Sequence, residues 1–271
     1  LDGTTLTPQG RLSRKTREAI EKALEAGIQV VAASGRSLDS LPADILAISG
    51  IQYGITSNGA AVYRLSDRKC LKQCKLTKES VREILKYTER QETAFEAFIE
   101  GKPYAQKEYV EDPVRFGATH RAIPYIQSTR EPVADMVSFI YDHQEILDCL
   151  DIVVKSEEKK KELWKTLREN VKDVYITSSV TQLLEISHRD SGKEAGIRFL
   201  LEYLGLKREG LAAFGDGDND REMLSYAQVG IAMENGSLEC KKAADWIAPS
   251  NENDGVAWGI EKLLEENQSG L

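Results

Sequence analysis

The sequence predicts an α/β protein whose core is a doubly wound parallel sheet, with a smaller α+β domain inserted into it. Helix-like and strand-like segments alternate along both ends of the chain, whereas the middle holds pairs of strand-like runs. Clusters of Gly, Ser, Asp and Asn directly follow several buried strand-like runs, which is where ligands bind in open α/β sheets. We expect residues 1–77 and 188–271 to form the core domain and residues 78–187 to form the insert.

Near the N-terminus, residues 13–28 predict a helix that leads directly into a strand. Ser13 is a suitable N-cap, small and apolar side chains recur at helical spacing, and Gly27 suits the position after the last turn. Residues 28–33 form a short run of β-branched and small side chains, typical of a strand covered on both faces. A helix followed by such a strand is half of a doubly wound unit.

The same alternation returns in the last third of the chain. A helix over 191–206 precedes a buried strand over 211–214, and the GDGDND segment then opens a short helix. Further predicted elements are a strand over 229–233, a helix over 237–244, a strand over 245–248 and a helix over 254–266. The two ends of the chain are therefore expected to build one parallel sheet.

The middle of the chain follows a different pattern. Helices are predicted over 78–90 and 157–170, and the charges of residues 157–162 are expected to form a solvated face with (i, i+4) pairs. Residues 93–99 and 103–109 flank a Glu-Gly-Lys turn and predict a hairpin, as do 173–179 and 182–187. Strand pairs with helices on one side indicate an α+β insert.

Composition limits the partners and the compartment. A net charge of −8 and a pI near 5.2 repel nucleic acid and anionic membranes, so an anionic substrate needs local cations or a metal. The four cysteines form no C-x-x-C pair and do not cluster with the three histidines, which indicates a reducing compartment. No apolar run approaches a membrane span and no signal-peptide core precedes the chain, so the cytoplasm is expected. Oligomeric state is not predicted.

Four polar motifs could carry chemistry. GDGDND, residues 215–220, places three carboxylates after a buried strand, a pattern that suits Mg2+ but also an ordinary Asx-capped turn. Ser34, Gly35 and Arg36 could bind a phosphate, or could form a turn with a surface arginine. Asn58-Gly59 is by itself most typical of a turn. Lys193 opens a helix, where its charge opposes the helix dipole, and this hints at a functional role.

The order of these motifs after LDGT at residues 1–4 resembles the haloacid dehalogenase (HAD) superfamily, in particular Cof-type phosphatases with a C2 cap. The resemblance implies a Rossmann-like core and makes the insert a cap. The family motif is D-x-D-G-T, so the resemblance places the catalytic nucleophile, an Asp, directly before Leu1. Its strand is central in the fold, and without it two neighbouring strands would lack partners and helices would cover a void. We therefore expect further residues before Leu1.

The resemblance also implies the roles of the site residues. The nucleophile would form an aspartyl phosphate, and Asp2 would act as general acid and base, with a pKa raised by neighbouring carboxylates. Mg2+ would be bound by the nucleophile, the Asp2 carbonyl and Asp216, with Asp220 direct or through water. The resemblance makes Ser34 and Asn219 phosphate contacts and Lys193 the cationic clamp, and it implies that the site is lined by Gly35, Arg36, Asn58 and Gly59.

The leading interpretation is a Mg2+-dependent phosphatase acting on a small phosphorylated metabolite, most simply a sugar phosphate. A phosphomutase or phosphotransferase and a non-catalytic binding module are the alternatives. Thr5 departs from the leucine common in the family, and Asp218 adds a carboxylate near the metal motif. In the cap, Arg115, His120 and Arg121 are candidates for substrate recognition, although a solvated surface explains each of them as well.

Overall fold

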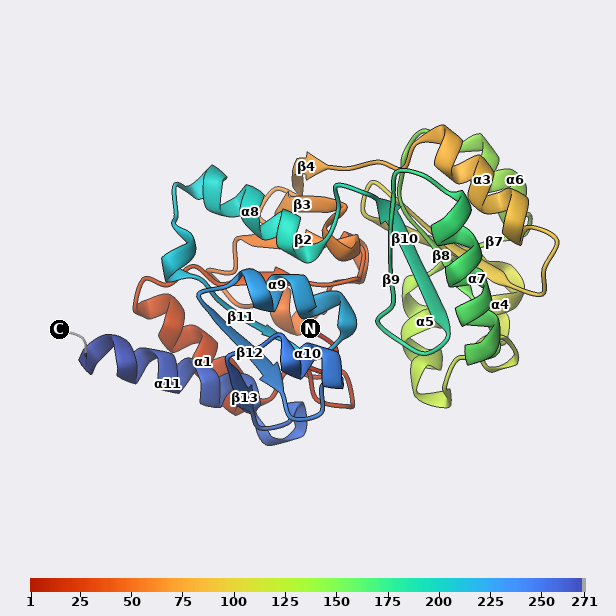
Figure 1. The fold of residues 1–271 in the computed structure, drawn as a ribbon. Helices are drawn as coiled ribbons and strands as arrows, with labels where there is room; N and C mark the ends of the chain where they lie inside the picture. The colour runs from red at the N-terminus through yellow and green to blue at the C-terminus, as the bar shows by residue number, and fades with distance from the viewer. Residues whose placement is uncertain (270–271) are drawn as a thin grey trace.

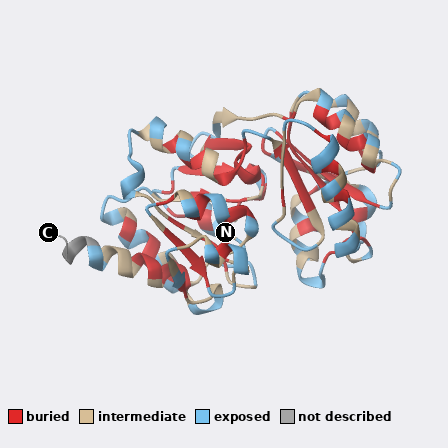
Figure 2. Cartoon of the chain, viewed as in Figure 1, coloured by how far each residue is buried: buried red, intermediate tan, exposed pale blue. Residues whose placement is uncertain are grey.

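The computed structural model describes residues 1–269, with side chains to residue 266, and divides them into two lobes (Figure 1). Both ends of the chain build one lobe, the core, and the middle of the chain builds the other, the cap. Apolar side chains fill the interior of each lobe in separate clusters, and Figure 2 shows buried residues inside both lobes. The predicted α/β core with an inserted α+β cap is therefore the observed architecture.

The core strands form two sheets instead of the single parallel sheet that was predicted. The first has the order β1-β2-β3-β4, with β1 parallel to β2 and the other pairs antiparallel. The second has the order β11-β12-β13 and is fully parallel. Their bounds are β1 Val31–Ala33, β2 Tyr53–Thr56, β3 Ala61–Arg64, β4 Lys69–Gln73, β11 Ala212–Gly215, β12 Val229–Met233 and β13 Trp246–Ala248.

An apolar slot separates the two core sheets. It has a volume of about 640 Å3 and is lined by β1 and β11 together with side chains of α1 and α8, among them Ile20, Val31, Leu200 and Phe214. Strands β1 and β11 each pair on one side only, and no strand of residues 1–269 lies between them. The split follows because backbone N–H and C=O groups of two edge strands cannot bond across a gap that wide.

Helices cover both faces of the core. Helix α1 begins after Ser13, whose side chain accepts a hydrogen bond from the N–H of Thr16, as predicted for its N-cap. It packs beside the C-terminal helix α11 on one face, whereas α8 and α9 cover the other. The bounds are α1 Arg14–Glu25, α2 Ala43–Leu46, α8 Lys193–Leu204, α9 Arg221–Tyr226, α10 Leu238–Lys242 and α11 Gly255–Ser269.

The cap is a six-stranded sheet of order β7-β6-β5-β8-β10-β9, and both predicted hairpins are present in it. Helices α3, α6 and α7 pack on one face, and α4 and α5 contact the other. The strands are β5 Ala94–Ile99, β6 Lys102–Gln106, β7 Glu131–Val133, β8 Leu147–Val153, β9 Val174–Thr177 and β10 Leu183–His188. The helices are α3 Lys78–Thr88, α4 Lys107–Glu111, α5 Ile123–Thr129, α6 Met136–Asp142 and α7 Glu157–Asn170.

The chain passes between the lobes twice, before α3 and after β10. Strand β4 ends at Gln73 in the core and α3 begins at Lys78 in the cap, on either side of the predicted boundary. Strand β10 extends to His188, one residue past the predicted boundary at 187. The division into 1–77, 78–187 and 188–271 stays a prediction.

Candidate active site

The predicted motifs meet at one edge of the core, on the side that faces the cap. Ser34 follows β1, Asn58 follows β2, and Asp216 follows β11. The carboxyl ends of parallel strands share one edge of a sheet, so these turns come together although they are far apart in sequence. The backbone nitrogen of Leu1 is buried among Lys193, Asp216 and Asp220.

A buried ion pair joins Lys193 and Asp220. Lys193 is the first residue of α8, its Nζ lies 2.6 Å from Oδ1 of Asp220, and both side chains are almost fully buried. Burial opposes both charges, but the attraction outweighs it: the pKa of Lys193 is raised and that of Asp220 is lowered. The other oxygen of Asp220 accepts N–H bonds from Asp216 and Gly217 at 2.9 and 3.0 Å. Asp220 therefore holds both the lysine and the loop in place.

Asp216 lies beside this pair and against the N-terminal turn. Thr4 donates its hydroxyl to Asp216, and Gly3, with φ of 71°, brings its backbone against the same carboxylate. A side chain at Gly3 would overlap Asp216, so the close approach requires glycine. Burial, and then the charge of Asp220, raise the pKa of Asp216. Two adjacent buried carboxylates favour a cation between or beside them.

These residues fit part of the magnesium site that the sequence implies. Asp216 and Asp220 supply two of the expected acidic groups, and the backbone of Asp2 is adjacent to Gly3 in the same turn. Within the described residues, however, no group of three or more acidic, histidine or cysteine side chains is arranged to hold a metal ion. Asp216 and Asp220 therefore supply only part of such a set among the described residues.

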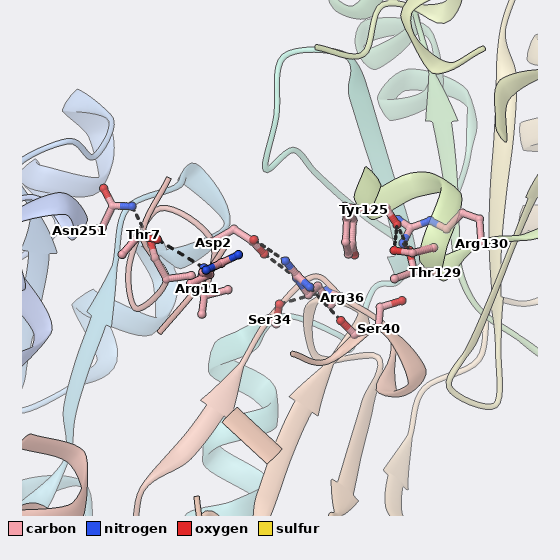
Figure 3. A network of polar contacts seen from close by, with 12 residues as sticks. Asp2, Thr7, Arg11, Ser34, Arg36, Ser40, Tyr125, Thr129, Arg130 and Asn251 are labelled. Carbon is pink, nitrogen blue, oxygen red and sulfur yellow. Dashed lines mark hydrogen bonds and ion pairs between the residues drawn. The ribbon is translucent and has the colours of Figure 1, made fainter. Parts of the chain in front are cut away.

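Asp2 is held by an arginine, which corrects the predicted raised pKa (Figure 3). The Arg36 guanidinium donates to Asp2 twice, from Nε at 2.8 Å and from Nη2 at 2.6 Å. Burial alone would raise the pKa of Asp2, but the hydrogen bonds and charge of Arg36 lower it below its usual range. The prediction considered neighbouring carboxylates and did not include Arg36, which it placed in the lining of the site, as a partner of Asp2.

A second polar cluster surrounds Ser34 and Asn58. The Ser34 hydroxyl accepts the N–H of Arg36 at 3.1 Å, and the N–H of Asn58 donates to the Ser34 carbonyl at 3.1 Å. The Asn219 amide donates to Oδ1 of Asn58 at 3.0 Å. Gly59 has φ of 88°, and a side chain there would overlap the carbonyl oxygen of Gly192, so the turn packs tightly against the start of α8.

Two cap elements contact this cluster and were missed in the sequence. Glu185, buried on β10, accepts a hydrogen bond from Asn58 Nδ2 at 2.9 Å. Tyr125 on α5 lies with its ring 4.2 Å from the Arg36 guanidinium carbon, and Arg130 stacks on the same ring at 4.8 Å. A glutamate inside the otherwise apolar run LLEIS was the available signal for Glu185.

A wide cleft opens beside Asp216 between the lobes. It has a volume of about 910 Å3, and its core side is formed by Asp216, Gly217, Asp218 and Ser237. Its cap side is α7 and the turn between β9 and β10. The predicted solvated face of residues 157–162 is present, since Lys161 and Glu157 are exposed and form an (i, i+4) pair at 2.8 Å. Lys160 and Lys161 also line the cleft. Arg115, His120 and Arg121 line neither this cleft nor the apolar slot.

All the predicted site residues lie in this one region. Hydrogen bonds, ion pairs and close backbone approaches connect them to one another in an unbroken series. They are Asp2, Ser34, Gly35, Arg36, Asn58, Gly59, Lys193, Asp216, Asn219 and Asp220.

Comparison with known proteins shows the family to which the chain belongs. A family model described as haloacid dehalogenase-like hydrolase matches residues 1–260. The chain belongs to the haloacid dehalogenase-like hydrolases. This hydrolase has a fold close to that of a solved HAD subclass IIB sugar phosphatase, with a TM-score of 0.82, 20% identity, and 97% and 96% of the two chains covered. The likeness shows that the predicted fold is correct.

Relatives of this HAD-like hydrolase carry two kinds of name. It is 28% identical to the Bacillus subtilis protein 5-amino-6-(5-phospho-D-ribitylamino)uracil phosphatase YwtE, over 97% of its own length and 96% of the relative's. It is 26% identical to the Arabidopsis thaliana protein endoribonuclease YBEY, chloroplastic, but spans only 45% of that protein. Within the described residues, no helix has the length and apolar character needed to cross a bilayer.

Proposed function

We propose that this hydrolase is a Mg2+-dependent phosphatase that cleaves a small phosphorylated metabolite through an aspartyl-phosphate intermediate. One observation carries the proposal: the buried Lys193–Asp220 pair lies beside Asp216, at the sheet edge where Ser34 and Asn219 present polar side chains. A buried cation beside neutral donors suits a phosphoryl group, whose charge spreads over several oxygens in the transition state.

In the proposed complex, each chain group has a separate task. Lys193 supplies the positive charge that offsets the phosphoryl oxygens, and the ion pair with Asp220 keeps it protonated and fixed. Ser34 Oγ and the Asn219 amide supply neutral donors. Asn58 positions Asn219, because its side-chain oxygen accepts the Asn219 amide. These groups bind and orient the phosphate without changing their own protonation.

We propose that the nucleophilic Asp lies on a strand that precedes Leu1 and occupies the apolar slot. The slot is bounded by β1 and β11, whose free edges could each pair with an inserted strand. Such a strand would end next to the buried Leu1 nitrogen, among Lys193, Asp216 and Asp220. A carboxylate there would complete the acidic set around the proposed Mg2+.

Asp2 is the proposed general acid and base. Residues i and i+2 of an extended segment point to the same side, which brings Asp2 and the proposed nucleophile to one site. While Arg36 holds Asp2, the carboxylate is ionised and suits the second step, in which it takes a proton from the attacking water. The first step needs a protonated Asp2, so this step requires the Arg36 contact to break.

The proposed metal would be held by Asp216, the Asp2 carbonyl and the upstream Asp, with Asp220 reached through water because its own oxygens are already engaged. When bound, Mg2+ would offset the negative charge of the phosphoryl group and its acidic neighbours. The raised pKa of Asp216, caused by burial and by Asp220, supports a cation at this position.

A sugar or sugar-alcohol phosphate is the proposed substrate class. The relative YwtE is named for a substrate with a phosphorylated ribityl chain, and the solved subclass IIB structure is described as a sugar phosphatase. The acidic chain and the polar cap residues near the site are compatible with hydroxyl-rich leaving groups, which both donate and accept hydrogen bonds.

The test is phosphate release by the full-length protein from p-nitrophenyl phosphate and a panel of sugar phosphates. We expect activity with Mg2+, loss of it with a chelator, and a reduction of at least about 100-fold in kcat for Asp216→Ala and for Lys193→Ala. Lys15→Ala, at an exposed lysine of α1 that lines neither the cleft nor the slot, is the matched control. Undiminished release in both site variants would refute the site, and phosphate transfer to an added sugar in place of release would indicate a phosphotransferase.

A further inference from the structure

The cleft beside Asp216 has a strongly cationic cap wall. Four positive side chains and one aromatic side chain of α7 line it, and they recur at helical spacing so that they share one face of the helix: Lys160, Lys161, Trp164, Lys165 and Arg168. The whole chain carries a net charge of −8, so a one-sided positive stripe departs from the general surface. The loop that carries Asp216 lines the same cleft from the core.

The cations of this wall differ in how far they are already engaged. Lys161 pairs with Glu157, and Lys160 donates to the Ser178 hydroxyl and to the carbonyl of Val180 at 2.9 Å. Lys165 and Arg168 are exposed and have no ion-pair or hydrogen-bond partner among the described residues. They are therefore available to a ligand in the cleft. Glu169, next to Arg168 in the sequence, is an acidic side chain that also lines the cleft.

The core wall of the cleft carries two carboxylates, of which Asp218 attracts Lys160, but in the described part of the chain neither forms an ion pair with Lys165 or Arg168. Its charged side chains are Asp216, which belongs to the proposed metal site, and Asp218, which already accepts the Ser237 hydroxyl at 2.6 Å. No ion pair joins α7 to the core within the described residues. A ligand between the two walls would meet Asp216 of the proposed metal site on the core wall and the unpaired cations of α7 on the cap wall.

We infer that α7 reads a second anionic group on the substrate, so that the preferred substrates are small sugar-like metabolites with a phosphate or carboxylate besides the scissile phosphate. The inference rests on the proposed phosphatase function. Lys165 and Arg168 bind the second anion, and the Trp164 ring packs against the carbon skeleton between the two charges. The cleft volume of about 910 Å3 accommodates a ligand larger than a single phosphate.

The experiment compares fructose 1,6-bisphosphate with fructose 6-phosphate at constant ionic strength, since screening weakens exposed charges. The full-length enzyme should show a higher kcat/KM for the bisphosphate. Lys165→Ala with Arg168→Ala should lower that preference by about tenfold, the effect of losing a charged hydrogen bond, and should leave the monophosphate within about twofold. Alanine preserves the helix, so folding is not at risk.

The matched control removes two lysines of the same region that do not line the cleft, Lys159 and Lys172, again with alanine. It carries the same loss of net charge, and the preference for the bisphosphate should persist. If both double variants lower the preference equally, the effect is general electrostatics and the inference is wrong. An active enzyme with no preference for the bisphosphate also overturns it, while the proposed function stands.

A binding measurement separates the inference from catalysis. Trp164 lines the cleft, so its fluorescence reports occupancy, and Trp164→Phe identifies the signal against Trp246 and Trp258 of the core. Titration with fructose 1,6-bisphosphate without divalent metal should give an affinity about tenfold weaker in the Lys165 and Arg168 double variant. Equal affinities would overturn the inference. Weakened binding in a protein without phosphatase activity would show that Lys165 and Arg168 bind the anion, but it would refute the phosphatase and with it the assignment of that anion to a substrate.

Discussion

At the scale of single residues, the site depends on charges that are buried in pairs. Lys193 and Asp220 are each about 5% exposed, and each is kept ionised by the other. A pair of this kind adds little net stability compared with apolar neighbours, but removal of one partner leaves an uncompensated charge in the interior. The pair therefore fixes the geometry of the site, and loss of one partner should lower the stability of the fold.

This property predicts an asymmetric response to substitution. Lys193→Met should lower the free energy of unfolding by about 3 kcal/mol or more, because Asp220 then lacks its cation. Lys193→Met combined with Asp220→Asn should recover a large part of that loss. Urea denaturation of the two variants measures the difference. A double variant as unstable as the single one would show that packing, and not charge, sets the cost.

At the scale of elements, the cap sheet carries a row of acids across three strands. Glu96 on β5, Asp151 on β8 and Glu185 on β10 are register partners, and all three are buried. Arg130 pairs with Glu96 at 2.7 Å, and Asn58 binds Glu185. Among the described residues, the Cys149 thiol at 3.0 Å is the one side-chain donor to Asp151. Burial, and then the charges of Glu185 and Glu96, raise the pKa of Asp151 well above its usual value.

The direction of that shift predicts how stability changes with pH. Above a pH of about 4 the unfolded chain has lost the Asp151 proton while the folded chain keeps it, so the folded state binds more protons and its stability falls as pH rises. Asp151→Asn removes this dependence, and its stability relative to the unsubstituted chain should increase from pH 4 to pH 7. Chemical denaturation across that range is the measurement.

Asp135, also in the cap, should change stability with pH in the opposite direction and serves as a control. Asp135 caps α6, and hydrogen bonds from Ser138 lower its pKa. It contributes stability above its unfolded pKa that is lost in acid, so Asp135→Asn should be destabilising at pH 7 and nearly neutral at the lowest pH. If Asp151→Asn instead follows the trend of Asp135→Asn, Asp151 is ionised in the folded cap.

At the scale of the whole molecule, one arginine links the chemistry to the closure of the cap. Arg36 binds Asp2 in the core and stacks on Tyr125 of the cap, as Figure 3 shows. The lobes are joined by only two chain crossings, and relative motion is the usual behaviour of domains with so few connections. Contacts such as Arg36 with Tyr125 and Asn58 with Glu185 therefore help to hold the lobes in the arrangement seen here.

Loss of the Tyr125 ring should open the molecule. A cation–π contact of about 0.5 to 2 kcal/mol is enough to change the ratio of closed to open forms severalfold. Tyr125→Ala should increase the radius of gyration in small-angle X-ray scattering without ligand, whereas Tyr125→Phe, which keeps the ring, should not. Identical scattering from Tyr125→Ala and the unsubstituted chain would show that the stacking does not hold the cap.

Much of this protein could be predicted from local sequence, because short-range patterns decide it. Helix caps such as Ser13, turn glycines and buried strand runs set the elements, and the order of the polar motifs indicated the family and the residues that meet at the site. Two arrangements depended on tertiary structure. The side chains that line the slot between β1 and β11 depend on the packing of α1 and α8, although a void without the strand before Leu1 was expected, and Asp2 is paired with Arg36, 34 positions away.

The contacts between the cap and the core also depended on the tertiary structure. Glu185, Tyr125 and the α7 stripe reach the site only because the insert folds back over the core, and no periodicity in the sequence encodes which cap surface faces inward. Local patterns fix secondary structure because their energies involve neighbours along the chain. Pairing of charges between lobes depends on how separate surfaces meet, so pKa directions and cleft chemistry were decided by the tertiary structure alone.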